Sequence, residues 1–406
     1  MEFDTDIVIA GGGPNGTTMA LALASGGFRV TLIDPLAKRT RKGAKFDGRS
    51  YAMAIASMRV LTALGVWQTL GDVQPILDIK VTDGRAGEGP SPLMLAFDHA
   101  EIEEGPMGYM VEDRRLRPAL LAAVAQSDIT EIHGESVIKE ITDASGVTVT
   151  LSNETTLRAR LLIACDGKKS AIAQRAGIKR IGWEYDQSAL VAAIAHERPH
   201  GGTAHQFFMP SGPLAILPLT EDRASIVWTE NRHRAAQIQA MDDDAYLNEL
   251  RPRFGDFLGD IKLAGARFSY PLELSIAGSF VAPRTALVGD SAHAVHPIAG
   301  QGLNAGLKDV AALADVLVDA HRRGEDIGRA DVLARYQQWR RFDAASLALA
   351  TDTFNKLFSN DNSALRLIRD IGLGVTNAIP GLRRGLIREA AGLTGDLPRL
   401  ARGEAL

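Results

Sequence analysis

The first 34 residues carry the pattern that most restricts how this chain can fold. A short, continuous apolar run at residues 6–10 is followed by glycine-rich residues 11–16, a helix-forming run at 17–24 and a second apolar run at 29–34. A strand that is buried on both faces of a parallel sheet has such an apolar run. The pattern therefore predicts a strand–helix–strand unit within an α/β domain.

The spacing of three glycines predicts a dinucleotide site in this unit. Gly11 allows a tight turn, Gly13 lets the backbone approach a pyrophosphate, and Gly16 permits close packing of the helix on the strand. Asp34 ends the second apolar run, where its carboxylate can accept hydrogen bonds from ribose hydroxyls. A plain glycine-rich turn is the alternative, and the motif does not distinguish FAD from NAD.

Composition narrows the class of protein. The net charge of −4 gives no reason to expect nucleic-acid binding, and the single cysteine, Cys165, allows neither an intrachain disulfide nor a cysteine metal cluster. The acidic start of the chain runs straight into a strand and does not resemble an export signal. No apolar run reaches the roughly 18–20 residues that a membrane span needs. We expect a cytoplasmic protein that can contact a membrane surface.

A second motif, at residues 286–304, points to a bound flavin rather than to a nicotinamide alone. An apolar run stops at Gly289 and Asp290, a loop rich in proline and glycine follows, and a helix is expected to begin near Gly302. Such an arrangement presents backbone N–H groups and the positive end of a helix to an electron-rich group. We expect Asp290 to bind a ribityl hydroxyl, and the N–H groups around Gly302 and Leu303 to face the isoalloxazine ring.

With these motifs the chain resembles the class A flavoprotein aromatic monooxygenases and, within them, the ubiquinone-biosynthesis hydroxylases. Three spaced elements carry the resemblance: Gly11–Gly16, Asp166-Gly167 and Gly289-Asp290. Residues 296–304 are close to the form found in the ubiquinone subgroup, and the segments around Arg49 and Arg114 resemble its Asp-x-Arg and Val-Glu-Asn-Arg elements. The Asp-Gly pair alone could equally be an ordinary turn.

The resemblance implies the cofactor and the reaction. FAD would be bound, NAD(P)H would reduce it, and the reduced flavin would react with O₂ to give a C4a-hydroperoxyflavin that hydroxylates an electron-rich ring. The expected substrate is a polyprenylated phenol of ubiquinone biosynthesis, and the protein must position the ring and exclude water. Ala173 stands where the wider family often has arginine, which leaves nicotinamide recognition open.

The expected fold is a FAD-binding, Rossmann-like domain of the glutathione-reductase type with an inserted, mainly antiparallel β-sheet domain and a C-terminal helical segment. Strand-like segments dominate between residues 181 and 274, and helix-forming segments resume at Leu303. The predicted boundaries are a discontinuous FAD-binding domain at 1–75, 105–180 and 275–340, a substrate-binding β-sheet domain at 76–104 and 181–274, and a C-terminal helical region at 341–406.

The candidate site residues follow from the motifs and the resemblance. The predicted cofactor-binding residues are Gly11, Gly13, Pro14, Asn15, Gly16, Asp34, Arg49, Arg114, Asp166, Gly167, Asp290, Pro297, Gly300, Gln301, Gly302, Leu303 and Asn304. His296 and Pro297 are the catalytic candidates, and no metal site is expected. His293 and His296 could assist proton movement, although a loop histidine more often makes structural hydrogen bonds. Arg49 and Arg114 could neutralise pyrophosphate charge, the alternative being solvated arginines.

Two regions leave alternatives open. His205, Phe207, Phe208 and Trp228 could line a substrate pocket, although core packing is the usual role of such aromatics. The C-terminal segment mixes Leu and Ile with Arg at helical spacing, which suits a membrane surface, a biosynthetic-complex partner or a cap packed on the protein's own body.

Alternative functions also remain. A hydroxylase of a small soluble aromatic compound would share the flavin motifs. A catalytically silent flavin-fold subunit of a biosynthetic complex is the alternative from another class. A flavin halogenase fits less well, because the chain has no Trp-x-Trp-x-Ile segment.

Overall fold

A computed structural model describes residues 2–37, 46–91, 93–102, 104–294, 301–359 and 372–406. Strand β1 (Ile7–Ala10), helix α1 (Pro14–Ser25) and strand β2 (Val30–Asp34) form the strand–helix–strand unit expected at the N-terminus. β1 pairs in parallel with β2 on one side and with β13 (Leu161–Ala164) on the other. Every residue of these three strands is buried, as their continuous apolar sequences require.

The strand–helix–strand unit lies at the centre of a six-stranded sheet with the order β20-β21-β13-β1-β2-β9. The edge strands are β9 (Thr130–His133) and the short antiparallel β20 (Val281–Ala282), and β21 (Thr285–Leu287) lies between β20 and β13. Helices α1, α3 (Asp113–Ala125) and α7 (Gln301–Arg322) pack around the sheet and bury their apolar residues in one large core. The FAD-type α/β architecture that the sequence predicts is therefore confirmed.

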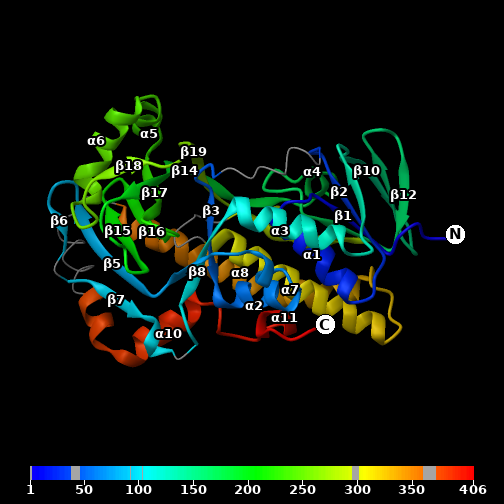
Figure 1. The fold of residues 1–406 in the computed structure, drawn as a ribbon. Helices are drawn as coiled ribbons and strands as arrows, with labels where there is room; N and C mark the ends of the chain where they lie inside the picture. Colours follow the sequence, from blue (N-terminus) through cyan, green and yellow to red (C-terminus); the bar gives the residue numbers. More distant parts are fainter. Residues whose placement is uncertain (1, 38–45, 92, 103, 295–300, 360–371) are drawn as a thin grey trace.

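A three-stranded meander joins this sheet at the end opposite the larger sheet (Figure 1). It consists of β10 (Val137–Thr142), β11 (Val147–Leu151) and β12 (Thr156–Ala159). The apolar run at residues 157–164 reads as one strand, but the structure divides it between β12 and β13. The division is at Arg160, whose N–H donates to the Asp6 carbonyl as the chain passes from one sheet to the other.

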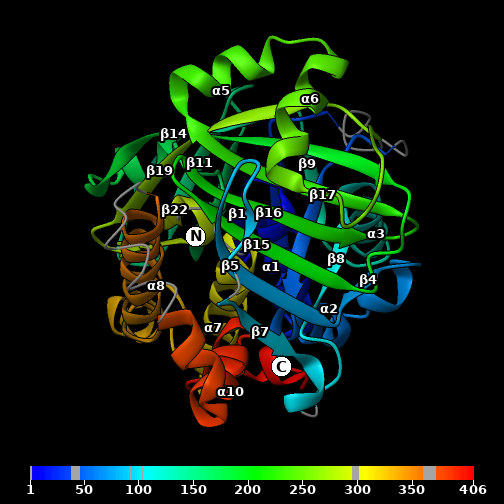
Figure 2. The ribbon, with the colours of Figure 1, turned by 90° about the vertical axis from the view of Figure 1, so that its left-hand side faces the viewer.

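The second large sheet has ten strands, most of them antiparallel, and stands at the other end of the molecule (Figures 1 and 2). Its strands are β5 (Asp78–Arg85), β6 (Gly89–Pro90), β7 (Leu95–Asp98), β14 (Arg180–His196), β15 (Thr203–Met209), β16 (Gly212–Leu219), β17 (Arg223–Asn231), β18 (Ile261–Leu263), β19 (Phe268–Ala277) and β22 (His293–Ala294). Helices α5 (Arg232–Gln239) and α6 (Asp243–Phe254) cover its outer face and bury Trp228 and Tyr246 there.

A small sheet and short helices lie between the two large sheets. Its strands, in the order β3-β8-β4, are β3 (Ser50–Ala54), β8 (Gly108–Glu112) and β4 (Gln74–Ile76). The helices α2 (Ile55–Ala63) and η2 (Trp67–Thr69) are associated with it, whereas η3 (His99–Glu101) follows β7, α4 (Ala171–Arg175) packs on β10 and η4 (Gly289–Ser291) packs on α7. β3 leads directly into α2, which packs on α7, so the small sheet is fixed to the parallel-sheet half.

The C-terminal helices are α8 (Ala330–Phe358), α10 (Pro380–Ala390) and α11 (Arg399–Arg402). α11 packs on the protein's own body, where Leu400 and Ala401 are buried. In contrast, α10 buries only Ile387 and lies beside β7 (Figures 1 and 2). Among the described residues, the helices are too short or too polar to cross a membrane.

Candidate functional site

The N-terminal glycine motif borders a cavity of 430 Å³, termed here the nucleotide cavity. Its lining includes Gly11, Gly13, Asp34, Asp166 and Gly167, which come from three distant parts of the chain. They meet because β1, β2 and β13 are parallel neighbours, so that their carboxyl ends share one edge of the sheet. Ligands of open α/β sheets bind at such an edge.

The three motif glycines have different surroundings. Gly11 has a φ of +104°, and a Cβ there would collide with the Cys165 carbonyl. A Cβ on Gly16 would collide with the Gly11 carbonyl, so the close packing of α1 on the loop depends on glycine. A Cβ on Gly13 would meet no atom within 4 Å. Gly13 therefore faces open space next to the N-terminus of α1, which fits the approach of a pyrophosphate.

Asp34 is held in place by the loop that it faces. Its carboxylate accepts hydrogen bonds from Gly12 N at 2.5 Å and Leu36 N at 2.7 Å. The side chain is thereby fixed at the border of the nucleotide cavity, at the end of β2. This is the position from which a carboxylate reaches a ribose.

A larger cavity of 610 Å³, termed here the central cavity, lies between the two large sheets. From the parallel-sheet half it is lined by six of the predicted cofactor residues: Pro14, Asn15, Arg49, Asp290, Gly302 and Leu303. From the ten-stranded sheet it is lined mainly by small and branched apolar residues. The first turn of α7, at Gln301–Asn304, thus points its N-terminus toward this space, as an anion or flavin site requires.

Two buried oxygen atoms on the wall of the central cavity have no hydrogen-bond partner within the described chain: Asn15 Oδ1 and Ser50 Oγ. Unsatisfied buried polar atoms are costly, so these atoms indicate a ligand with polar groups of its own. Asn15 is fixed in position, since a Cβ on Gly289 or Gly306 would collide with its side chain. The donor and acceptor groups present here fit the polyol and ring of FAD. Ser50 was not singled out from the sequence, although it follows Arg49 in the segment that resembles the Asp-x-Arg element.

Asp290 lies at the opening of the central cavity and is exposed there, while protein atoms surround it on its other sides. Partial burial raises the pKa of its carboxyl group above the ordinary value. The backbone at Asp290 and Ser291 is held by Arg180, a residue that was not predicted from the sequence. Arg180 donates to the Ser291 carbonyl at 2.5 Å, the Asp290 carbonyl at 3.3 Å and Ser275 Oγ at 2.7 Å.

His293 is part of a buried ionic network and does not line the cavities described above. Its Nε2 lies 2.6 Å from Asp309 Oδ2, which also accepts from Gly289 N at 3.0 Å, while Arg340 donates to Oδ1 at 2.8 Å. Burial would raise the pKa of Asp309, but His293 and Arg340 outweigh it and hold that pKa below its ordinary value. The network fixes the Gly289 turn to α7 and α8, which is a structural role.

Asn304 also has a structural role in the described chain. Its Oδ1 accepts from Ala54 N at 2.9 Å and from Ser57 Oγ at 2.7 Å, and its Nδ2 donates to the Ala52 carbonyl at 2.8 Å. The side chain therefore joins α7 to the end of β3 and the start of α2. It brings β3, with Ser50 and Ala52, to the wall of the central cavity.

The two candidate arginines differ in their positions. Arg49 borders the central cavity and pairs with Asp47 at 2.7 Å. Arg114 lines neither of the two cavities; it pairs with Glu112 at 2.5 Å and stacks on the Phe46 ring. His296, Pro297 and Gly300 lie outside the described residues.

The comparisons with known proteins agree with this geometry. Residues 4–349 match the family described as FAD binding domain. The chain belongs to this family. Ubiquinone hydroxylase UbiL from Rhodospirillum rubrum is 43% identical, with 99% of this chain and 93% of the relative covered. The 3-demethoxyubiquinol 3-hydroxylase of Escherichia coli is 35% identical, with 96% and 99% covered. The resemblance to flavin-dependent monooxygenases of the ubiquinone-hydroxylase group is confirmed.

This chain shares its fold with a protein of known structure. The crystal structure of p-nitrophenol 4-monooxygenase PnpA from Pseudomonas putida matches with a TM-score of 0.78 over 97% of this chain and 99% of that chain. The sequence identity is 18%, so this likeness concerns the fold alone.

In this monooxygenase, strands β14, β16 and β17 form the wall of the central cavity opposite the flavin motifs. Alternate side chains of each strand face the cavity. Ala189, Val191, Ala215, Leu217 and Val227 line the cavity, whereas their neighbours in sequence pack beneath α5 and α6. Trp228 and Phe207 belong to that outer core, and Phe208 packs in a separate cluster. The centroids of the His205 and Phe257 rings lie 4.5 Å apart in a tilted arrangement, and His205 likewise does not border the cavity. The core interpretation of these aromatics therefore holds.

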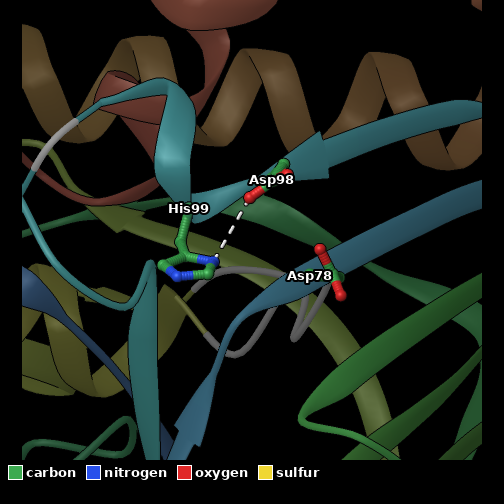
Figure 3. Close-up of side chains that lie close together, drawn as sticks. All are labelled: Asp78, Asp98 and His99. Atoms are coloured by element: carbon green, nitrogen blue, oxygen red, sulfur yellow. Dashed lines mark ion pairs between the residues drawn. The ribbon is translucent and has the colours of Figure 1, made fainter.

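One grouping of potential metal ligands occurs among the described residues, at Asp78, Asp98 and His99 (Figure 3). Each side chain already has a structural contact. Asp98 caps η3 by accepting from Ala100 N at 2.9 Å, His99 Nδ1 lies 3.1 Å from the Leu77 carbonyl, and Asp78 accepts from Thr203 Oγ1 at 3.4 Å. We assign no metal function to this grouping.

Proposed function

We propose that this protein is a FAD-dependent monooxygenase that hydroxylates the aromatic ring of a polyprenylated phenol in ubiquinone biosynthesis, with NAD(P)H as reductant and O₂ as co-substrate. The observation that carries the proposal is the central cavity, whose one side is formed by the flavin motifs and whose other side is a wall of small apolar side chains. The identities of the ubiquinone hydroxylases that resemble this chain support the class of substrate.

The bound flavin would supply hydride acceptance and oxygen activation, which no side chain provides. The chain's own residues would hold it in two parts. Gly13 and Asp34 would bind the pyrophosphate and the adenosine ribose in the nucleotide cavity. Asp290 would bind the ribityl chain, and the N–H groups of Gly302 and Leu303 would face the ring.

The apolar wall has two tasks in this proposal. Ala189, Val191 and Ala215 leave room for an aromatic ring, since their side chains are short. They also exclude water, which would favour transfer of the activated oxygen to the aromatic ring over its loss as hydrogen peroxide. Pro297 would shape the ring environment and His296 would assist proton transfer; both remain proposals.

The proposed organisation of the chain is the one stated above, with a discontinuous FAD-binding domain, an inserted β-sheet domain and a C-terminal helical region. We also propose a cytoplasmic location with peripheral contact at the inner face of the membrane. The exposed Leu382 and Leu386 of α10 support it, because a polyprenylated substrate resides in the lipid phase.

The test is turnover by the purified protein. It should be yellow, oxidise NADH or NADPH faster with a prenylated phenol present, and transfer one atom of ¹⁸O₂ into the product detected by mass spectrometry. Turnover of small soluble phenols alone would favour the alternative hydroxylase. Bound FAD without any substrate-stimulated reduction would favour a catalytically silent subunit.

A further inference from the structure

A narrow apolar chamber lies between α10 and the small sheet, next to the central cavity. It has a volume of 70 Å³ and is lined by Ile76, Ile79, Phe97, Met107 and Ile387, together with Ala390 at its outer end. Gln301 and Asn304 supply the polar part of the lining. Gln301 and Asn304 belong to the second flavin motif, whereas the apolar side chains that form most of the chamber lie outside the flavin motifs and outside the proposed ring-binding wall.

The chamber and the central cavity are neighbours. Ala52 of β3 lines both of them. Leu217 and Met110 line the central cavity and pack in the same apolar cluster as Ile76, Met107 and Ile387. A continuous cluster of apolar side chains therefore joins the proposed ring-binding wall to α10.

The continuation extends to the protein surface. Phe97 of β7 packs in a cluster with Leu95 and Leu373. Large apolar side chains near this cluster are exposed. They are Leu93, which precedes β7, and Val375, Ile379 and Leu382 of the C-terminal segment. Ala96 N donates to Asn377 Oδ1 at 3.0 Å, which places this segment against β7.

We propose that the chamber is the binding site for the isoprenoid tail of the substrate and that α10 is its outer wall. This inference rests on the proposed function, because it assumes a tailed phenol whose ring occupies the central cavity. An isoprenoid chain is branched, apolar and without hydrogen-bonding groups, which matches a lining of Ile, Phe and Met. A polar partner or a second protein chain would not fit so narrow a passage.

The chamber is narrow, so the tail enters only when α10 shifts outward. The attachment of α10 permits such a shift. Ile387 is the one buried side chain of the helix. Arg383 Nε pairs with Glu101 at 2.8 Å and Arg388 lies 3.9 Å from Glu104, and partly exposed ion pairs of this kind contribute little to stability.

The first test compares two substitutions on α10. Ala390→Phe adds a ring at the outer end of the chamber, where the residue is exposed and the fold should tolerate it. Gly385→Phe is the matched control, since a Cβ on Gly385 meets no atom within 4 Å and the residue is not part of the lining. Both variants are assayed with a long-tailed phenol and with the same phenol carrying a methyl group in place of the tail.

We expect Ala390→Phe to lower kcat/KM for the tailed phenol by about tenfold or more, with little change for the methyl analogue and none for Gly385→Phe. An equal loss for both substrates, or no loss for the tailed one, would overturn the inference.

The second test does not need turnover. A phenol with a photoactivatable diazirine at the third isoprenoid unit is crosslinked to the FAD-loaded protein, and labelled peptides are identified by mass spectrometry. Labels on β7 or α10 support the chamber, and labels confined to β19 near Tyr270 would overturn it. If the wild type hydroxylates neither substrate, the proposed function fails, whereas the crosslink positions still decide the tail site.

Discussion

Glycine serves two different purposes in the loop at residues 11–16, and the two are separable by mutation. Gly11 has a positive φ and a backbone carbonyl where its Cβ would be, whereas Gly13 faces open space. We expect Gly11→Ala to lower the free energy of unfolding of the apoprotein by about 1–3 kcal/mol. Gly13→Ala should leave that energy nearly unchanged and weaken FAD binding by about tenfold or more, because a methyl group would occupy the pyrophosphate position.

Chemical denaturation of the apoprotein and FAD titration by flavin fluorescence would measure the two effects. Unchanged FAD affinity in Gly13→Ala would contradict the assignment of that space to the pyrophosphate.

Asp309 should control stability at acid pH. Its pKa in the folded state lies below the ordinary value, so its pairing with His293 and Arg340 stabilises the protein above the unfolded-state pKa of about 3.9. That stabilisation is lost as the pH falls below about 4 and through the folded-state pKa. Asp309→Ala should cost about 3–5 kcal/mol at pH 7, because it removes the buried partner of both His293 and the Arg340 Nε group and leaves Arg340 only its pair with Asp343.

The control for Asp309 is Asp331→Ala, which removes an exposed partner of Arg329 and should change stability very little. Urea denaturation between pH 3 and pH 7 gives both values. A wild-type minus Asp309→Ala difference that does not shrink toward pH 3 would contradict the role of this charge.

Residues that act through local spacing were predictable, and residues that act through distant contacts were not. Gly11, Asp34 and Asp290 were identified because a turn and a strand end fix their positions within a few residues. Arg180 of β14 contacts η4 directly, and β3, which carries Ser50, is joined to α7 by the bond from Asn304 to the Ala52 carbonyl; both contacts join residues more than 100 positions apart. His293 was recognised as notable, but its partners Asp309 and Arg340 come from α7 and α8.

At the scale of elements, the link between β14 and η4 holds the turn at Gly289–Ser291 in place. Arg180, at the start of β14, donates to two carbonyls of η4. Arg180→Met should lower FAD affinity by about tenfold and reduce the melting temperature of the apoprotein by several degrees. Arg329→Met, which removes an exposed ion pair, is the control and should change neither quantity.

Isothermal titration with FAD and differential scanning fluorimetry measure these changes. Wild-type affinity in Arg180→Met would show that η4 keeps its shape without this strand contact.

The elements were predictable where one periodicity persists, as in the continuous apolar run of β1. The run at 157–164 was read as one strand because apolar residues continue through it, while the structure changes sheets at Arg160. The strand-like character of residues 181–274 was also predicted, and β14, β16 and β17 lie in that region. The sequence did not show which face of the ten-stranded sheet packs against α5 and α6 and which face lines the cavity, because this choice depends on tertiary packing.

At the scale of the whole molecule, α10 and the meander lie at opposite ends (Figure 1). If α10 contacts the membrane, the double substitution Leu382→Gln/Leu386→Gln should reduce flotation of the protein with anionic liposomes. The matched control is Ile138→Gln/Ile141→Gln, which removes two equally exposed apolar side chains from β10. Equal flotation of wild type and the α10 variant would contradict membrane contact through this helix.

The central claim is that FAD and a phenolic ring meet in the cavity between the two sheets. Its most direct measurement is the ¹⁸O₂ incorporation by the purified, FAD-loaded protein given NAD(P)H and a prenylated phenol. The account predicts one labelled oxygen atom on the aromatic ring, and a strongly reduced yield when Val191→Trp fills the apolar wall. A protein that binds no FAD, or that yields unlabelled product, would contradict it.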